Sequence, residues 1–289
     1  MFESELETAC RLARDAGKLI LEHYAREIIA EEKLGVDNFY EPVTIADREA
    51  SEIIVSSLAA SFPNDAILSE EEKDDASHRL SKSRTWIIDP IDGTAGFVRK
   101  DGDFGVQIGL IEEGQPVLGV VHLPYLEKTY FAALGLGSFC QENGNKSRLN
   151  VSGKTDFTEM NLAVTKNHPS ERMQRILEEF AFKTQVKRGS VGLKIGLIAE
   201  RICDIYIHPS PRTKLWDTCA PQIILEEAGG LMSDLFGFPL IYDAEDLQNH
   251  NGILATNRAS HDEAVEKLKG LMNEFGRLRV IPKQRAQGN

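Results

Sequence analysis

The sequence predicts a layered fold in which an α+β part is joined to an α/β part. In the first half, segments with helical periodicity are followed by short apolar runs, and turn residues separate these runs from one another. Beyond about residue 156, strand-like and helix-like segments alternate. Because no low-complexity linker divides the chain, we expect one body with a cleft between subdomains of residues 1–155 and 156–289.

The first part is predicted to begin with two helices. Residues 4–28 carry apolar or small side chains at helical spacing, and a second helix is expected from about Asp47 to Ser61, before Pro63. A meander of antiparallel strands should follow, because apolar runs of strand length are separated by turn residues such as Gly114. Its expected strands are residues 66–70, 84–89, 104–113, 116–123 and 128–134.

The second part alternates between two periods, which is typical of an α/β layer. Four short apolar runs are separated by longer segments of helical period. Strands are expected at residues 161–165, 184–188, 204–208 and 252–257, and helices near residues 170–181, 191–201, 217–228 and 260–274.

Composition limits the classes of function. With 289 residues, 42% of them hydrophobic, the chain can bury a large core, and its net charge of -12 argues against nucleic-acid binding. An anionic substrate would need bound cations to reverse the local sign. The four cysteines have no paired spacing, which indicates a reducing cytoplasm. We expect neither a secretory leader nor a membrane span, because no run of about 18 apolar residues occurs.

The stretch "WIIDPIDGT", residues 86–94, is the first candidate site. Pro90 favours an extended backbone at Asp89, so the carboxylate should project from the strand end. The Ile91 carbonyl and Asp92 follow at once. Three oxygens would then share a small volume, as hard cations such as Mg²⁺ require. The alternative is an ordinary turn after a strand, since Asp-Gly is a common turn pair.

Glu70 and Asp217 are further candidate ligands. Glu70 follows the apolar run "AIL" and can lie at a strand end beside Asp89. Glu71 is a candidate for supporting the ligands from behind, whereas Glu72, Asp74 and Asp75 are expected to be solvated. Asp217 follows Trp216 at the start of a predicted helix. There it either caps the helix or points into the cleft from the second half of the chain.

Asp47 and Thr94 are candidate catalytic residues. Thr44 and Asp47 have the spacing of a capping box, which by itself would explain both residues. Alternatively, Asp47 orients a hydroxyl or a water beside the metals. In "DGTAGF" the N–H groups of Gly93 and Thr94 would open a short helical turn and could bind phosphate oxygens, while the Thr94 hydroxyl could relay a proton.

The stretches "VTIAD", "SEEE", "WIIDPIDGT" and "WDTCAPQIILEEAGG", in this order, resemble the inositol monophosphatase superfamily of metal-dependent, lithium-inhibited phosphatases. The resemblance extends from the first helix to at least Tyr242 and implies an alternating stack of helices and mixed sheets. It implies that Asp47 and Thr94 position and deprotonate the attacking water, and that the Gly93 and Thr94 N–H groups hold the phosphate. It also implies two or three Mg²⁺ ions, with ligands at Glu70, Asp89, the Ile91 carbonyl, Asp92 and Asp217.

The substrate is less clearly indicated. "WDTCAP" and "GSVGLKIGLIAE" look closest to the 3'(2'),5'-bisphosphate nucleotidase branch, in which Lys194 would lie near the substrate; the alternative is an exposed helix residue. Arg212 and Lys214 are candidates for binding a second phosphate. Ala95 fits neither this branch nor the monophosphatase branch, and Gly96 differs from the asparagine usual in the latter.

The predicted function is therefore that of a cytoplasmic Mg²⁺-dependent phosphomonoesterase that removes the 3'-phosphate of adenosine 3',5'-bisphosphate. The alternative within the class is an inositol or sugar monophosphatase, and the alternative outside it is a non-catalytic acidic cation-binding protein. The expected partner is a small phosphorylated metabolite, with no nucleic acid and no membrane. A homodimer is one expected assembly, since homodimers are common in the superfamily. Cys219 is expected to be a buried, inert thiol.

Overall fold

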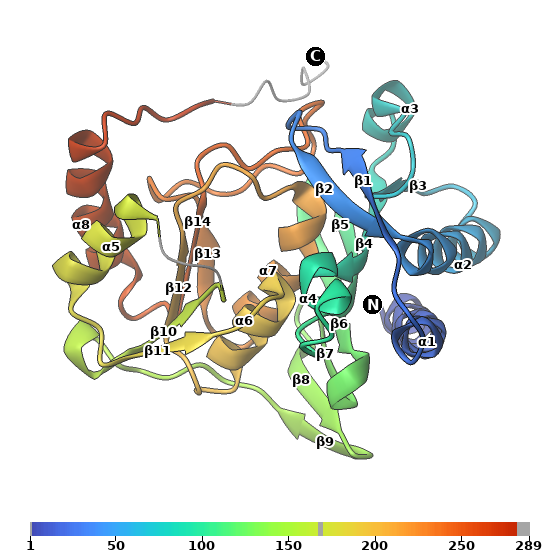
Figure 1. Cartoon of the computed structure of the whole chain (residues 1–289), viewed down its shortest axis with the longest axis horizontal. Coiled ribbons are helices and arrows are strands. Elements are labelled where there is room, and N and C mark those ends of the chain that lie inside the picture. The colour runs from blue at the N-terminus through green and yellow to red at the C-terminus, as the bar shows by residue number, and fades with distance from the viewer. Residues whose placement is uncertain (1, 167–169, 282–289) are drawn as a thin grey trace.

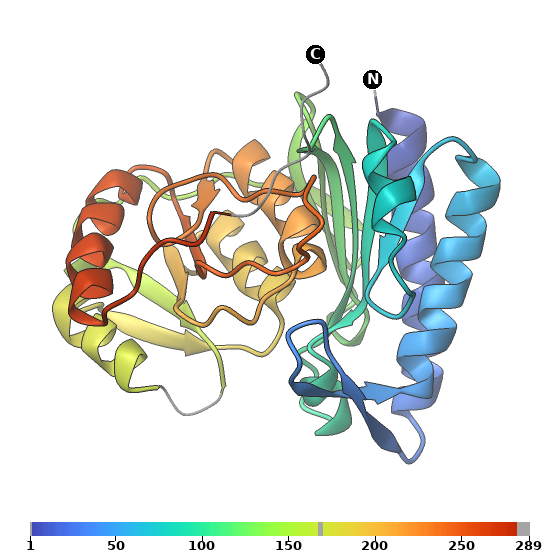
Figure 2. The same cartoon turned by 90° about the horizontal axis from the view of Figure 1, so that it is seen from above.

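The computed structural model describes residues 2–166 and 170–281. Its layers alternate in the order helices, sheet, helices, sheet, helices (Figures 1 and 2). This arrangement confirms the layered sandwich that the sequence predicts. None of the helices in these residues is long and apolar enough to cross a membrane.

The first outer layer consists of α1 (Glu3–Tyr24) and α2 (Ile45–Ser61). Both lie on the outer face of a seven-stranded sheet (Figure 2). In α1 the buried residues include Ala9, Ala13, Ala16 and Ile20, which share one face because they are three or four positions apart. The helix ends at Tyr24, four residues before the expected boundary.

The seven-stranded sheet has the order β3-β4-β5-β6-β7-β8-β9. The expected meander is antiparallel only from β4 onward, because β3 pairs with β4 in parallel. The chain returns between them through α3 (Ala76–Leu80), which was not predicted. Strands β8 and β9 were also not predicted. The strands are β3 (Ala66–Ser69), β4 (Arg84–Asp92), β5 (Gly105–Glu112), β6 (Gln115–Leu123), β7 (Lys128–Ala133), β8 (Gly137–Glu142) and β9 (Asn145–Arg148), with a 3-10 turn at Pro124–Leu126.

Strand β4 continues three residues further than predicted. Its pairing with β5 shifts between Asp89 and Asp92, so Pro90 lies in a bulge and is not required to donate a ladder hydrogen bond. The chain then turns at Gly93, whose φ of 94° is in the left-handed region that glycine adopts without strain, and enters α4 (Thr94–Val98). Asp89 and Asp92 are therefore presented from one bulged strand end.

The second sheet has the order β11-β10-β12-β14-β13 and is mixed, with β10, β11 and β12 parallel and β14 antiparallel to both of its neighbours. Its outer face is covered by α5 (Glu171–Phe180) and α8 (His261–Glu274) (Figure 2). Strand β13 and the 3-10 turn before β10 were not predicted. The strands are β10 (Asn161–Val164), β11 (Thr184–Lys187), β12 (Ile205–His208), β13 (Leu231–Ser233) and β14 (Ile253–Thr256), preceded by a 3-10 turn at Phe157–Glu159.

The central layer consists of α6 (Val191–Ala199) and α7 (Leu215–Glu227), which lie between the sheets (Figure 2). Every residue of α6 is buried. One continuous cluster of buried apolar side chains includes residues of both sheets and both central helices. The two halves share this core. The predicted boundary between two subdomains after residue 155 therefore stays a prediction.

A hairpin of β1 (Ala30–Leu34) and β2 (Tyr40–Thr44) was not predicted. It connects α1 to α2 and extends beside the sheet edge toward the second half of the chain (Figure 2). Strand β1 is mostly exposed, and β2 changes from exposed to buried along its length, so neither shows the alternation of apolar and polar residues that marks a half-buried strand. This hairpin carries several residues of the site described next.

Candidate metal centre

Three carboxylates converge where the two halves of the chain meet. Asp89 and Asp92 come from the end of β4, and Asp217 comes from the first turn of α7. One oxygen of each carboxylate lies within 4.8 Å of the others. The convergence depends on tertiary packing, because α7 rests on β5 and β6, next to the strand that carries both other acids.

Asp89 has the most demanding environment of the three. It is 2% exposed, and its Oδ1 has no hydrogen-bond partner within the described residues. Burial, together with the charges of Glu70, Asp92 and Asp217, raises the pKa of Asp89 well above its usual value. A buried, unpaired carboxylate oxygen beside other carboxylates fits a hard divalent cation, which takes oxygen ligands and offsets their repulsion.

Asp217 and Asp92 are each held by backbone N–H groups. The Lys214 N–H donates to Asp217 Oδ2 at 2.6 Å, although burial and the charge of Asp92 still raise the pKa of Asp217 to about 8. The N–H groups of Val191 and Gly192 donate to the Asp92 carboxylate at 3.1 and 2.8 Å. Through these bonds the N-terminus of α6, in the second half of the chain, holds the end of β4, in the first half.

Ser190 and burial complete the environment of Asp92. The Ser190 hydroxyl donates to Asp92 Oδ2 and accepts from the Leu193 N–H, so it also caps α6. Burial raises the pKa of Asp92 in spite of these bonds. Asp92 is therefore a well-oriented candidate ligand, and a cation beside it would offset the cost of burying its charge.

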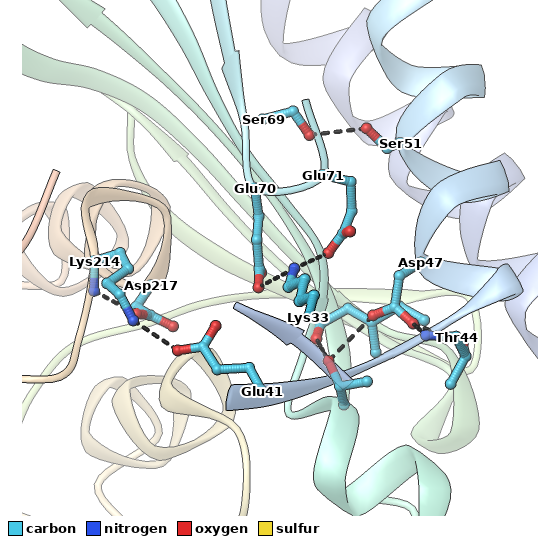
Figure 3. Close-up of polar contacts among 12 residues, drawn as sticks. Lys33, Glu41, Thr44, Asp47, Ser51, Ser69, Glu70, Glu71, Lys214 and Asp217 are labelled. Carbon is cyan, nitrogen blue, oxygen red and sulfur yellow. Dashed lines mark hydrogen bonds and ion pairs between the residues drawn. The ribbon is translucent and has the colours of Figure 1, made fainter. Parts of the chain in front are cut away.

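Glu70 lies at the end of β3, where its N–H donates to the Ile88 carbonyl. Lys33 of the hairpin donates to Glu70 Oε1 at 2.8 Å and forms a second ion pair with Glu71 (Figure 3). Burial raises the pKa of Glu70, and the Lys33 charge opposes this rise. In this arrangement the ammonium group of Lys33 supplies positive charge beside Glu70.

Asp47 performs the capping role and also faces the site. Its Oδ2 accepts from the Thr44 N–H at 2.8 Å and the Thr44 hydroxyl at 2.6 Å (Figure 3). Its Oδ1 accepts from the Thr94 hydroxyl at 3.1 Å. The Thr94 hydroxyl is also 3.0 Å from the Ile91 carbonyl. Burial raises the pKa of Asp47. The two interpretations of Asp47 are thus compatible, since each uses a different oxygen.

A pocket of about 260 Å³ opens onto these groups. A larger pocket of about 730 Å³ adjoins it, since Glu41, His208 and Arg212 line both. Most of the candidate site residues line the smaller pocket. Among the residues that line it are Glu70, Asp89, Ile91, Gly93, Thr94, Ala95, Arg212, Lys214, Trp216 and Asp217.

Arg212 and Lys214 join the hairpin to the second half. Lys214 is buried, and its Nζ donates to Glu41 Oε1 at 2.8 Å (Figure 3). Arg212 pairs with Asp37 at 3.2 Å and lies over the Phe39 ring, 4.4 Å from its centroid. Both cations line the pocket, and Arg212 keeps a side-chain exposure of 44%.

Lys194 is buried behind the pocket lining. Its side chain is 1% exposed, lines neither pocket, and donates to the Gly189 carbonyl at 3.0 Å. The ammonium also lies 4.7 Å from the centroid of the Tyr206 ring, and burial lowers its pKa to about 8. Because α6 is enclosed between the two sheets, Lys194 is not an exposed helix residue, and its contact with a substrate stays a prediction.

Lys33, Glu41, Ser190 and His208 were missed in the sequence. Lys33 and Glu41 lie on the unpredicted hairpin, and Ser190 precedes α6 as an N-cap, a position whose sequence signal is purely structural. Burial, followed by the charge of Lys194, lowers the pKa of His208 to about 3, so this pocket residue is neutral. Cys219 is buried, and burial raises the pKa of its thiol, which disfavours the reactive thiolate.

A layered α/β protein in which buried carboxylates converge beside a pocket has the construction of a hydrolase that binds divalent cations. The model of the inositol monophosphatase family matches residues 2–273. The chain therefore belongs to this family, and it is a phosphatase that hydrolyses phosphomonoesters. The non-catalytic alternative is not supported.

Relatives of known name agree with this assignment. The chain is 34% identical over 252 residues to the 3'(2'),5'-bisphosphate nucleotidase CysQ of Aggregatibacter actinomycetemcomitans, covering 86% of this chain and 91% of the relative. It is 32% identical over 237 residues to CysQ of Escherichia coli K12, covering 82% and 93%.

Solved structures show the same fold. CysQ from Bacteroides thetaiotaomicron, a bacterial member of the inositol monophosphatase family, has a TM-score of 0.76 and 30% identity, covering 89% of this chain and 98% of that one. The Thermotoga maritima IMPase has a TM-score of 0.77 and 29% identity, covering 94% and 100%. The resemblance to the nucleotidase branch of the superfamily is thus confirmed.

Proposed function

We propose that the protein is a Mg²⁺-dependent phosphomonoesterase that removes the 3'-phosphate of adenosine 3',5'-bisphosphate in the cytoplasm. The observation that carries the metal dependence is the buried carboxylate of Asp89, which has an unpaired oxygen and converges with the carboxylates of Asp92 and Asp217. The substrate rests on the relatives named bisphosphate nucleotidase, each matched over most of its length.

Two or three Mg²⁺ ions are proposed to bind Glu70, Asp89, the Ile91 carbonyl, Asp92 and Asp217. Bound Mg²⁺ supplies charge neutralisation of the phosphate and activation of a water. Lys33 binds only one oxygen of Glu70, so Glu70 can bind a cation through its other oxygen, or release Lys33, which can then pair with Glu71 alone. Asp92 can keep its backbone partners at α6, because a carboxylate oxygen has more than one acceptor site.

Asp47 and Thr94 are proposed to accept the proton of the attacking water. The Thr94 hydroxyl can receive a hydrogen bond from that water while it donates to Asp47 Oδ1. The raised pKa of Asp47 makes its carboxylate a better proton acceptor than an exposed aspartate. The N–H groups of Gly93 and Thr94, at the pocket wall, are proposed to bind the phosphate oxygens.

The remainder of the substrate is proposed to extend into the larger pocket. That pocket is lined by apolar residues such as Met173 and Ile207 and by the cations Arg172, Lys187 and Arg212. An apolar wall with positive charge suits a nucleoside that carries a second phosphate. Arg212, which lines both pockets, is the proposed substrate-binding residue, whereas Lys194 lies buried behind the pocket lining.

The test is phosphate release from adenosine 3',5'-bisphosphate, inositol 1-phosphate and fructose 1,6-bisphosphate, each with and without Mg²⁺. We expect Mg²⁺-dependent release with the highest kcat/KM for the nucleotide. A preference for inositol 1-phosphate would replace the proposed substrate by that of a monophosphatase and keep the metal chemistry. Release that does not depend on Mg²⁺ would contradict the proposed metal centre.

A further inference from the structure

A buried glutamine lies directly behind the metal centre. Gln107 on β5 is 0% exposed, and both its Nε2 and its Oε1 lack hydrogen-bond partners in the described part of the chain. A buried carboxamide without partners costs the fold free energy that an apolar side chain of the same size would not cost. Such a residue calls for a functional explanation.

The strand register places Gln107 beside Asp89. The two residues are directly opposite each other in the antiparallel pair of β4 and β5, so their side chains leave the sheet on the same face, with Cβ atoms about 5 Å apart. This face is the one covered by α7, because a Cβ at Gly109, the next position on it, would lie 2.6 Å from Cys219 Sγ.

The first turn of α6 lies near Gln107 on the side of β6. Gln107 is opposite Val121 of β6, and Val121 contacts Gly192, where an added Cβ would lie 2.7 Å from the valine side chain. Gly192 is one of the residues whose N–H binds Asp92. Gln107 is therefore enclosed by Asp89 and by the helix ends that carry or fix Asp217 and Asp92.

The unpaired atoms are chemically complementary. Gln107 Nε2 offers two donors, and Asp89 Oδ1 is a buried acceptor without a donor. We infer that Gln107 is a positioning residue of the metal centre: when the centre is filled, its carboxamide hydrogen-bonds the Asp89 carboxylate, directly or through one buried water. A water there would have the polar partners that buried waters need. The inference rests on the proposed metal dependence.

The test replaces Gln107 by methionine, which keeps the length of the side chain and removes its polar atoms. We expect the Gln107→Met variant to unfold without metal at the same temperature as the original protein or a higher one. We expect its affinity for Mg²⁺, measured by titration calorimetry, to fall by about tenfold, the lower end of the effect of removing a residue that orients a ligand. The Gln107→Asn variant, which retains the carboxamide, should recover part of the affinity.

Ser138 provides a matched control. Its hydroxyl is also buried and without a partner in the described residues, but it lies on β8, beyond β6 and β7 in the order of the same sheet. The Ser138→Ala variant should change thermal stability without changing Mg²⁺ affinity.

Unchanged Mg²⁺ affinity in Gln107→Met would overturn the inference. Gln107→Leu takes its place if the methionine variant does not fold. Failure of the original protein itself to bind Mg²⁺ would contradict the proposed function as well, and this outcome differs from a loss confined to the Gln107 variants.

Discussion

Asp47 shows that one side chain can serve both fold and chemistry. Its Oδ2 accepts two hydrogen bonds from Thr44 and so holds the start of α2, while its Oδ1 accepts from Thr94. Because Thr94 lines the pocket, the helix cap also fixes the hydroxyl that faces the proposed reaction. Removing the charge of Asp47 without changing its shape should therefore separate the two roles.

We predict that Asp47→Asn lowers kcat by about 100-fold or more, the usual range for loss of a proton acceptor, while Mg²⁺ still binds. Asp47 is the third residue of α2 and accepts from the N-cap residue Thr44; asparagine keeps one oxygen that can accept the Thr44 N–H, so the free energy of unfolding should fall by only about 1 kcal/mol or less. Kinetics and Mg²⁺ titration of the same sample check both statements. Glu52→Gln, which removes an exposed carboxylate of the same helix, is the control. A fully active Asp47→Asn enzyme would contradict the assignment.

At the scale of elements, the position of α7 decides where Asp217 lies. The helix approaches β5 and β6 closely because both strands have glycine beneath it. At Gly119 an added Cβ would lie 2.4 Å from the Ala220 carbonyl oxygen, which is backbone and has no rotamer by which to move away. The glycines are thus part of the construction of the metal centre, although they do not touch it.

Gly119→Ala should push α7 away from the sheet. We predict that it lowers the free energy of unfolding by about 1–3 kcal/mol, the usual cost of overpacking, and weakens Mg²⁺ binding because Asp217 moves with the helix. Denaturant unfolding and Mg²⁺ titration measure the two effects. Gly270→Ala in α8, where an added Cβ meets open space, should instead stabilise the protein by up to about 1 kcal/mol. Equal effects at both glycines would show that close packing under α7 is not the cause.

At the scale of the whole molecule, the metal centre is a contact between the two halves of the chain. Asp89 and Asp92 belong to the first half and Asp217 to the second, in a protein whose net charge is -12. Bringing these carboxylates together in a buried space opposes folding until cations bind. Folding and Mg²⁺ binding should therefore be coupled.

We predict that Mg²⁺ raises the melting temperature of the protein. A ligand at 100 times its Kd adds about 2.7 kcal/mol to the free energy of unfolding, which corresponds to several degrees in a protein of this size. In Asp217→Asn the rise should be mostly lost. The metal-free variant should melt above the metal-free original, because a pKa of about 8 means that folding near neutral pH must protonate the Asp217 carboxylate or hold its charge beside Asp92, and asparagine removes this cost. Thermal scans across a Mg²⁺ series, with KCl at matched ionic strength as the control, measure this. An equal rise in both proteins would place the bound Mg²⁺ elsewhere.

Most of the second half of the fold could be predicted from local pattern. Strands β10, β11, β12 and β14 and helices α5 to α8 lie close to the expected segments, and all of them except the mostly exposed β11 are buried or amphipathic. Some missed elements are largely exposed, such as β1 and β9, whereas the short strands β8 and β13 were missed although at least half of their residues are buried. The parallel pairing of β3 with β4 was missed because periodicity gives the strands and not their direction.

The amino-acid sequence already specified the available chemistry: acids at strand and helix ends, and "DPIDGT" after an apolar run. Which acids meet was set by the folded structure, because Asp92 and Asp217 are 125 positions apart and converge through the packing of α6 and α7 between two sheets. It also decided that Lys33 reaches Glu70, that Lys194 is enclosed, and that Gln107 lies behind Asp89. The physical reason is that burial and proximity, which set charge and pKa, arise from contacts between distant segments.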